Sequence, residues 1–404
     1  MAGRGDAAAG PPVTTYLDHG ATTPLRPEVA RAMAEALSEP LGNPTGSHRP
    51  AQRARRLLEE ARDVVAAQLG ARPAEVIFTS GGTESANLAV LGTLAAAPER
   101  AVGEEHPLQV LCSAVEHPAV REACRAAAGG GPLPVSVREL PVDPSGVIEL
   151  EALLEATDRG TTLVAVMLAN NETGVLQPLD RVGDAVRARS GSARLFTDAV
   201  QAPTFLDLAE WTAAADLVAV SAHKVGGPVG AGALVVRTPA EVVPQHHGGG
   251  QERERRSGTQ DVVGAVGLAA ALTLAAAERD ETVRRVAALR DRLAEGLLGA
   301  VPGAHRTVPA GVATLPGHLH LCFAGLEREE LLVVLGEQGI CVSGGSSCAS
   351  GALEPSYVLD AMGVPAELAK GAVRFTLGHD TTDADVERAI ALVPGVVVAL
   401  GHDA

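Results

Sequence analysis

Aromatic side chains are scarce in this sequence, whose 404 residues include only five Phe, two Tyr and one Trp. Positive charge is also limited, because 49 acidic residues outnumber 33 Lys and Arg and give a formal net charge of −16. Nucleic-acid binding needs basic patches and stacking platforms, so we expect no direct contact with nucleic acid. If the protein binds a flat ring, a side chain other than Phe, Tyr or Trp must stack on it.

The cysteines form no CxxC pair, and their number is odd: Cys112, Cys124, Cys322, Cys341 and Cys348. This pattern argues against a disulfide framework and a structural zinc site, and we expect no bound metal. The same cysteine pattern favours a protein that works in a reducing compartment. No apolar run reaches the roughly 18 residues that a membrane span needs, and the first fifteen residues lack the apolar stretch of a signal peptide. We therefore expect a cytoplasmic protein that does not bind membranes.

Short apolar runs rich in Val, Leu and Ile alternate with longer stretches of helical periodicity. This alternation predicts an α/β fold, with a mostly parallel mixed sheet between helices. In such sheets, polar loops at the strand ends build the ligand site. The strand candidates are 76–79, 109–112, 163–168, 194–196, 217–220 and 233–236.

The pattern changes after about residue 264, where a long helical stretch (263–298) is followed by a Pro/Gly-rich segment. Two further strand candidates, 318–322 and 340–343, indicate a smaller α+β domain. A chain of 404 residues is long for one core, so two domains are expected. We predict an N-terminal segment (1–25) that joins the small domain, a large ligand-binding domain (26–275) and a small C-terminal domain (276–404).

Lys224 directly follows a strand candidate and precedes a glycine-rich turn. Partial desolvation at such a position lowers the pKa of an amine and makes it a better nucleophile, as Schiff-base formation requires. Ser221 and His223 stand at the same strand end, where they could hold a phosphate or the lysine. The alternative is a surface lysine beside a flexible turn.

Asp198 lies 26 residues before Lys224 and also follows a short apolar run. Pyridoxal 5'-phosphate (PLP) acts as an electron sink only while its pyridine nitrogen stays protonated, which a buried carboxylate ensures. Gln201, one helical turn later, could donate to the ring hydroxyl oxygen. Alone, an Asp after a strand is more often a helix N-cap, but its pairing with Lys224 favours a PLP site.

Three more polar positions follow strand candidates. Gly82 and Thr83 open a helix, whose free N–H groups and positive dipole end suit a single phosphate, although a plain capping box would look similar. His117 could stack on a ring and carry protons, or be structural. Asn171 could bind a ring oxygen or a substrate carboxylate, or simply favour a turn.

Taken together, these motifs resemble the class V aminotransferase-like PLP enzymes, and most closely the cysteine desulfurases of the iron–sulfur-cluster and nitrogen-fixation type. The resemblance runs from residue 16 to about residue 382. It rests on 16–23 (YLDHGATT), 42–44 (GNP), 79–84 (TSGGTE), 116–117 (EH), 170–172 (NNE), 198–201 (DAVQ), 221–224 (SAHK), 247–253 (HGGGQER), 256–259 (RSGT), 346–348 (SSC) and 374–375 (RF). His19, Gly20 and Ala51 depart from the usual pattern, but none of these changes removes a reactive group.

The resemblance implies the type I fold of PLP-dependent transferases, with Lys224 as the Schiff-base lysine and Asp198 paired with the pyridine nitrogen. Asn171 and Arg374 are implied to bind the substrate's carboxylate. Thr259 is implied to reach the phosphate of a second subunit, so the resemblance implies a homodimer. The residues implied to bind the cofactor are Gly82, Thr83, His117, Asn171, Asp198, Gln201, Ser221, His223, Lys224 and Thr259.

Cys348 lies in a run of small and polar residues (342–356) between a strand candidate and a helix pattern. Such a loop is typically exposed, and a reactive thiolate needs access. The resemblance implies that Cys348, with Lys224 and His117 as the other catalytic residues, takes the sulfur of L-cysteine as a persulfide. A sulfur-acceptor protein, such as an iron–sulfur scaffold or a tRNA-thiolation enzyme, is then the expected partner, and the sequence leaves an acceptor in a dedicated natural-product pathway open.

Three other functions remain compatible with the sequence. A selenocysteine lyase would use similar steps on the same scaffold. In a transaminase reaction, Cys348 would have no catalytic role. A phosphate- or nucleotide-binding module without catalysis would use the glycine-rich helix start but would bind no covalent cofactor.

Overall fold

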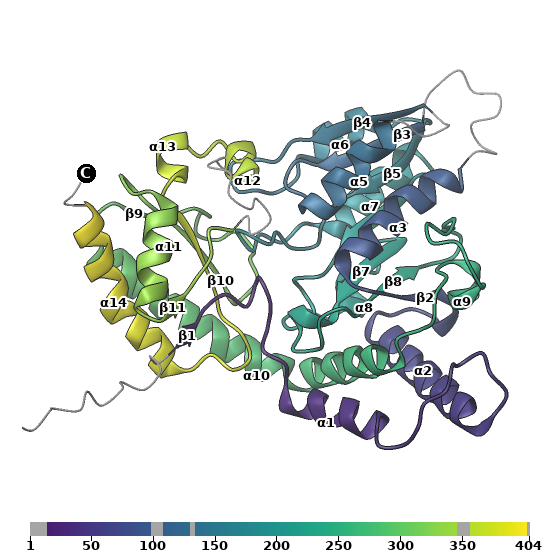
Figure 1. The fold of residues 1–404 in the computed structure, drawn as a ribbon. Helices are drawn as coiled ribbons and strands as arrows, with labels where there is room; N and C mark the ends of the chain where they lie inside the picture. Colours follow the sequence, from purple (N-terminus) through teal and green to yellow (C-terminus); the bar gives the residue numbers. More distant parts are fainter. Residues whose placement is uncertain (1–13, 98–107, 130–133, 346–355, 402–404) are drawn as a thin grey trace, which may run out of the picture.

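The structure is a computed structural model that describes residues 14–97, 108–129, 134–345 and 356–401. Figure 1 shows a larger body built on a seven-stranded sheet and a smaller one built on a three-stranded sheet. Helix α10 (Val262–Ala300) runs beneath both bodies and links them.

The large sheet has the strand order β2-β8-β7-β6-β5-β3-β4. Only β8 runs antiparallel to its neighbours, and all other pairs of neighbours are parallel. This confirms the predicted mixed, mostly parallel sheet. Its strands are β2 (Val76–Thr79), β3 (Leu108–Ser113), β4 (Val135–Leu140), β5 (Thr161–Ala165), β6 (Arg194–Asp198), β7 (Leu217–Ser221) and β8 (Gly232–Val236).

Helices cover both faces of the large sheet, because successive side chains of each strand point to opposite faces and both sets are apolar. In β6, Phe196 packs in the cluster that includes α3 and α5, whereas Leu195 packs in the cluster that includes α2, α6, α7 and α10. The covering helices are α2 (Arg49–Gln68), α3 (Gly82–Ala95), α5 (Pro118–Ala128), α6 (Leu150–Ala156) and α7 (Leu179–Arg189).

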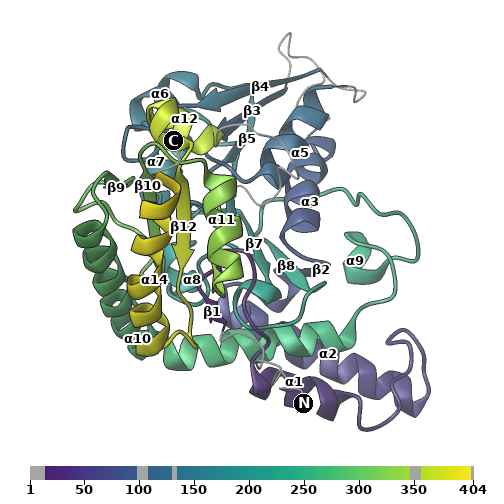
Figure 2. The same ribbon diagram turned by 60° about the vertical axis from the view of Figure 1, so that its left-hand side comes forward.

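The small sheet is antiparallel, with β10 (His318–Phe323) between β12 (Ala372–Thr376) and β9 (Ala304–Arg306). Beside it, α11 (Arg328–Glu337) and α14 (Asp383–Gly401) pack against each other (Figure 2). The remaining helices are α1 (Pro27–Ala36), α8 (Leu208–Trp211), α9 (Gln251–Glu254), α12 (Tyr357–Ala361) and α13 (Ala366–Ala369).

The N-terminal segment pairs with elements of the smaller body. β1 (Thr15–Tyr16) lies parallel to β11 (Ile340–Cys341), and Asp18 forms a bridge with Thr376 of β12. Helix α10 continues without a break through residue 275, so no loop marks the boundary between the two bodies there. The domain limits at residues 25 and 275 stay predictions.

Within the described ranges, α10 is also the one helix long and apolar enough to cross a membrane, judged by length and composition. Half of its most apolar stretch is buried inside the protein, where Leu268 and Leu272 belong to the core. A buried core helix accounts for the same pattern.

Candidate active site

A pocket of about 270 Å³ opens at the carboxyl ends of the parallel strands, between the two bodies of the protein. Ten of the residues singled out in the sequence line it, as do Gly20, Met167, Glu172 and Tyr357. The ten are Gly82, Thr83, His117, Asn171, Asp198, Gln201, Ser221, His223, Lys224 and Arg374.

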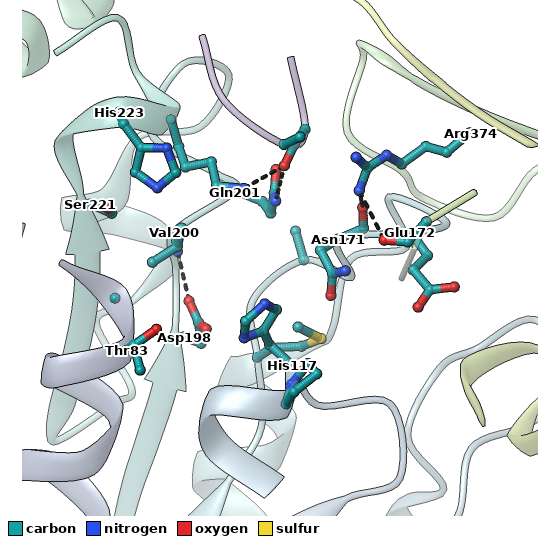
Figure 3. A pocket seen from close by; sticks show the side chains of 18 of the residues that line it. Thr83, His117, Asn171, Glu172, Asp198, Val200, Gln201, Ser221, His223 and Arg374 are labelled. Atoms are coloured by element: carbon teal, nitrogen blue, oxygen red, sulfur yellow. Dashed lines mark hydrogen bonds between the residues drawn. The ribbon is translucent and has the colours of Figure 1, made fainter. Parts of the chain in front are cut away.

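Asp198 is the last residue of β6 and is buried, with 8% of its surface exposed. The Val200 N–H donates to Asp198 Oδ1 over 2.9 Å (Figure 3). Burial raises the pKa of Asp198, although His117, the Val200 N–H and Lys224 act against this rise. A buried carboxylate at this position is stabilised by a cationic partner. A protonated pyridine nitrogen is such a partner.

Lys224 ends the short turn Ala222–Lys224 that follows β7. Its Nζ donates to the carbonyl oxygen of Gly20 over 2.5 Å, and Gln201 Nε2 donates to the same oxygen over 2.9 Å. The sequence contains only one other lysine, Lys370, which is partly exposed on the smaller body and forms an ion pair with Glu367 at 2.9 Å. Lys224 is therefore the only lysine that can form a Schiff base in this pocket.

Glycines open a cradle at the start of α3, where no side chain caps the first N–H groups. A Cβ on Gly82 would lie 2.9 Å from Val200 Cγ2, and a Cβ on Gly232 would lie 2.6 Å from the Cα of Gly81. Because side chains would clash at both positions, only glycine lets the backbone come this close. Free N–H groups at the start of a helix bind phosphate well.

His223 stands beside the cradle, with its Nδ1 3.1 Å from the hydroxyl of Thr22. Burial and the nearby Lys224 lower the pKa of His223 to about 4, so its ring is neutral near pH 7. A neutral imidazole can still donate one hydrogen bond to a phosphate oxygen.

His117 caps the N-terminus of α5, and the Ala119 N–H donates to its Nδ1 over 3.1 Å. Burial lowers the pKa of His117, which favours the neutral ring. Since Nδ1 accepts a hydrogen bond, the single ring proton lies on Nε2. The cap thus fixes both the orientation and the tautomer of the ring at the pocket wall.

Arg374 and Asn171 line the opposite end of the pocket from the cradle (Figure 3). Arg374 is buried in β12, where it donates to the Asn171 carbonyl oxygen over 2.7 Å and to Asp18 Oδ1 over 2.7 Å. Neither Arg374 Nε nor Asn171 Oδ1 has a hydrogen-bond partner among the described residues. A polar ligand at this end would satisfy such buried atoms, and an arginine beside an amide suits a carboxylate.

Two buried carboxyl groups belong to recognised motifs but had no role assigned from the sequence: Glu172 lines the pocket, and Glu116 precedes the pocket-lining His117. Glu116 Oε1 accepts from the Met167 N–H over 2.5 Å, and burial raises the pKa of Glu116 well above its usual value. Glu172 Oε2 accepts from the Ser356 hydroxyl over 2.6 Å, and burial raises the pKa of Glu172 as well. The only indication of a role in the sequence was that Glu116 precedes His117 and that Glu172 follows Asn171.

Of the predicted site residues, Thr259 lies outside the pocket and Cys348 lies outside the described residues. Thr259 is exposed and lines a separate depression with Ser80 and Gly232, so its predicted contact with a second subunit stays a prediction. The described residues on either side of the segment that contains Cys348 are Gly345, which lines the pocket, and Ser356, which donates to Glu172.

The free energy of unfolding of the ligand-free protein is expected to fall as the pH falls from about 6.5 to about 4. Burial lowers the pKa of His223 to about 4 and that of His320 to about 3, against 6.5 for an unburied histidine. Within this window the unfolded chain binds protons at these histidines that the folded protein does not, so their contribution favours unfolding in acid and is restored above about 6.5. The raised pKa values of Asp198, Glu116 and Glu172 act in the opposite direction. Urea unfolding followed by circular dichroism across this range measures the effect.

A pair of variants separates this cause from other acid effects. His320→Asn should make the pH dependence shallower, because one buried neutral ring is lost. His305→Asn, which changes an exposed ring, should leave the dependence as in the wild type. Unfolding midpoints that do not change with pH would contradict the explanation.

Comparisons with known proteins place this site in a family. The sequence profile of the class-V aminotransferases matches residues 15–389. The "IscS-like cysteine desulfurase" of Mycobacterium tuberculosis is 41% identical over 384 residues, covering 95% of this chain and 96% of that protein. Among solved structures, a "NIFS-LIKE PROTEIN" has a TM-score of 0.87 at 33% identity, covering 96% of this chain and all of the other. "SspA in complex with cysteine" has a TM-score of 0.75 at 29% identity, covering 90% and 99%.

The chain therefore belongs to the class-V aminotransferases, which are PLP-dependent enzymes with the type I fold. Within them it belongs to the cysteine desulfurase family. The pocket fits this cofactor: Asp198 suits the ring nitrogen, the start of α3 suits the phosphate, and Lys224 supplies the amine.

Proposed function

We propose that this protein removes sulfur from free L-cysteine, releases L-alanine, and passes the sulfur as a persulfide on Cys348 to an acceptor protein. The observation that carries the proposal is the convergence of Lys224, Asp198 and the glycine cradle in one pocket. The buried polar atoms of Arg374 and Asn171 stand at its other end. The names of the relatives and the cysteine-bound structure of a similar protein support the choice of substrate.

The bound cofactor supplies an electron sink next to the α-carbon of the substrate. Arg374 and Asn171 orient the substrate through its carboxylate, which places the α-proton near Lys224. The Lys224 amine takes this proton, and the Gly20 carbonyl oxygen accepts a hydrogen bond from the resulting ammonium group. His117, neutral with its proton on Nε2, would stack on the cofactor ring and could donate that proton.

Sulfur transfer is assigned to Cys348. Its thiolate attacks the substrate sulfur, so that an S–S bond forms while the bond between sulfur and the β-carbon breaks. The electron pair left on the β-carbon takes up one proton, and the α-carbon takes back a proton from Lys224, which completes L-alanine. Three protons enter the reaction, namely the α-proton and the two thiol protons. One ends on the α-carbon, one on the β-carbon and one on the persulfide, so no external oxidant is needed.

A homodimer and a cytoplasmic location belong to the same proposal. The exposed position of Thr259 leaves it accessible to a second copy of the chain, as the family pattern implies. An iron–sulfur scaffold or a tRNA-thiolation enzyme is the proposed acceptor, because either protein takes sulfur from a persulfide. Sedimentation of the holoenzyme tests the dimer.

The deciding experiment incubates the PLP-loaded protein with L-cysteine and a reductant and measures alanine and sulfide together. Equal amounts of both support the proposal. Pyridoxamine phosphate formed with a keto acid would indicate a transaminase, and a protein that binds no PLP would indicate a binding module. A turnover with selenocysteine far above that with cysteine would favour a selenocysteine lyase.

A further inference from the structure

His318 is a buried histidine whose hydrogen bonding is incomplete. It lies at the start of β10, is 5% exposed, and neither ring nitrogen has a partner among the described residues. Burial and the charges of Arg374 and Lys224 lower its pKa well below 6.5, so the ring is neutral. A neutral imidazole carries one donor and one acceptor, and interior polar groups without partners normally bind ordered water.

His318 lines two cavities. The smaller one, of about 20 Å³, is also lined by Lys224, Gly20 and Gln201, three residues that line the active-site pocket as well. Its size and polar walls suit a single water molecule. The larger one, of about 130 Å³, is lined on its other side by Arg290, Asp291 and Arg306.

The larger cavity reaches solvent, because the side chains of Asp291 and Arg306 in its wall are 55% and 37% exposed. Empty cavities in proteins are lined by apolar groups, whereas both of these carry charged and polar groups. His318 therefore lines both a solvent-connected cavity and the small cavity that Lys224 also lines.

We propose that a water molecule occupies the cavity beside Lys224 and that His318 passes protons between this water and the larger cavity. The water takes a proton from the Lys224 ammonium and gives one to the unprotonated nitrogen of His318. The other ring nitrogen releases its proton to water in the larger cavity at the same time. No charged imidazole accumulates, and the reverse transfer restores the starting tautomer.

The consequence concerns the proton that Lys224 removes from the substrate, so this inference rests on the proposed function. Lys224 lines the main pocket, so substrate bound there would separate it from the solvent on that side. The route through His318 lets the lysine exchange this proton with solvent from the side of the smaller body. L-Alanine, the proposed product, offers a test that needs no sulfur transfer, because its α-proton can be removed and returned by the same lysine.

The experiment follows the loss of the α-proton signal of L-alanine by NMR, with PLP-loaded enzyme in D₂O. His318→Leu should slow this exchange roughly tenfold or more, within the usual range for a lost proton-transfer group. His320→Leu removes a buried histidine of the same strand that lines the larger cavity but not the small one, and it should stay within about twofold of the wild type. Equal exchange rates for His318→Leu and the wild type, or equally slow rates for both variants, would overturn the proposal.

A second variant separates water binding from proton transfer. Gln at position 318 has a donor and an acceptor but cannot exchange tautomers, so His318→Gln should keep the water and still exchange slowly. High-resolution crystal structures should show the water in the wild type and in His318→Gln, and not in His318→Leu. An empty cavity in the wild type, or fast exchange in His318→Gln, would refute the role of His318. A wild-type enzyme that never exchanges the α-proton would instead refute the proposed function.

Discussion

Replacing Lys224 by alanine is expected to lower alanine formation from L-cysteine by about 10³-fold or more. The variant loses the amine that holds the cofactor and removes the α-proton, and the other lysine of the chain, Lys370, does not line the pocket. Alanine is measured by amino-acid analysis of the reaction mixture. Borohydride reduction of the PLP-loaded wild type, followed by peptide mass spectrometry, should label the peptide that contains Lys224.

Lys370 provides a matched control, because it is the only other lysine of the chain and lies in an exposed ion pair with Glu367. Lys370→Ala should keep the wild-type rate and the same labelled peptide. A Lys224→Ala protein that still forms alanine at a tenth of the wild-type rate, or a label found on Lys370, would mean that the pocket is not the site of chemistry.

Replacing Cys348 by alanine should reduce sulfide and alanine formation by about 10²-fold or more while the cofactor stays bound. The residues that bind PLP are unchanged in this variant, so only the nucleophile that attacks the substrate sulfur is lost. Visible absorbance of the purified variant reports the cofactor, and the two product assays report the reaction. In the wild type, alkylation with a mass tag after brief exposure to cysteine should detect one additional sulfur on Cys348.

Cys341 is the suitable control cysteine, because it lies seven residues away on β11 and is partly exposed, unlike the buried Cys112, Cys124 and Cys322. Cys341→Ala should retain sulfide release. Full activity in Cys348→Ala, or a persulfide found on Cys341 instead, would remove Cys348 from the mechanism and leave the assignment of PLP chemistry intact.

Several of the predicted site residues that line the pocket share one feature: they follow apolar strands. Asp198, Ser221 and Lys224 stand at or just after the ends of β6 and β7, and parallel neighbouring strands bring such ends together. The order of elements in the chain was therefore enough to predict that these side chains meet. Arg374 was found by resemblance alone, because it lies inside β12, which no apolar run of the expected length marks.

Strands that lack an apolar run were not predicted from the sequence. The edge strand β4 (VSVREL) exposes polar side chains on several positions, as edge strands commonly do, so its pattern is not that of a buried strand. The long helix α10 was predicted from its periodicity, but the sequence could not show that this one helix links the two bodies of the protein.

The sequence by itself determined the alternation of strands and helices, the chemistry at the strand ends and the membership in the family, because these depend on local pattern and on the order of motifs. The tertiary structure alone decided which backbone atoms complete the site. The Gly20 carbonyl meets Lys224 across 204 residues, and the Thr376 hydroxyl that holds the Gly20 N–H lies 356 residues away in the chain. The local sequence pattern does not predict such contacts, because they form only where the smaller body packs against the strand ends of the large sheet.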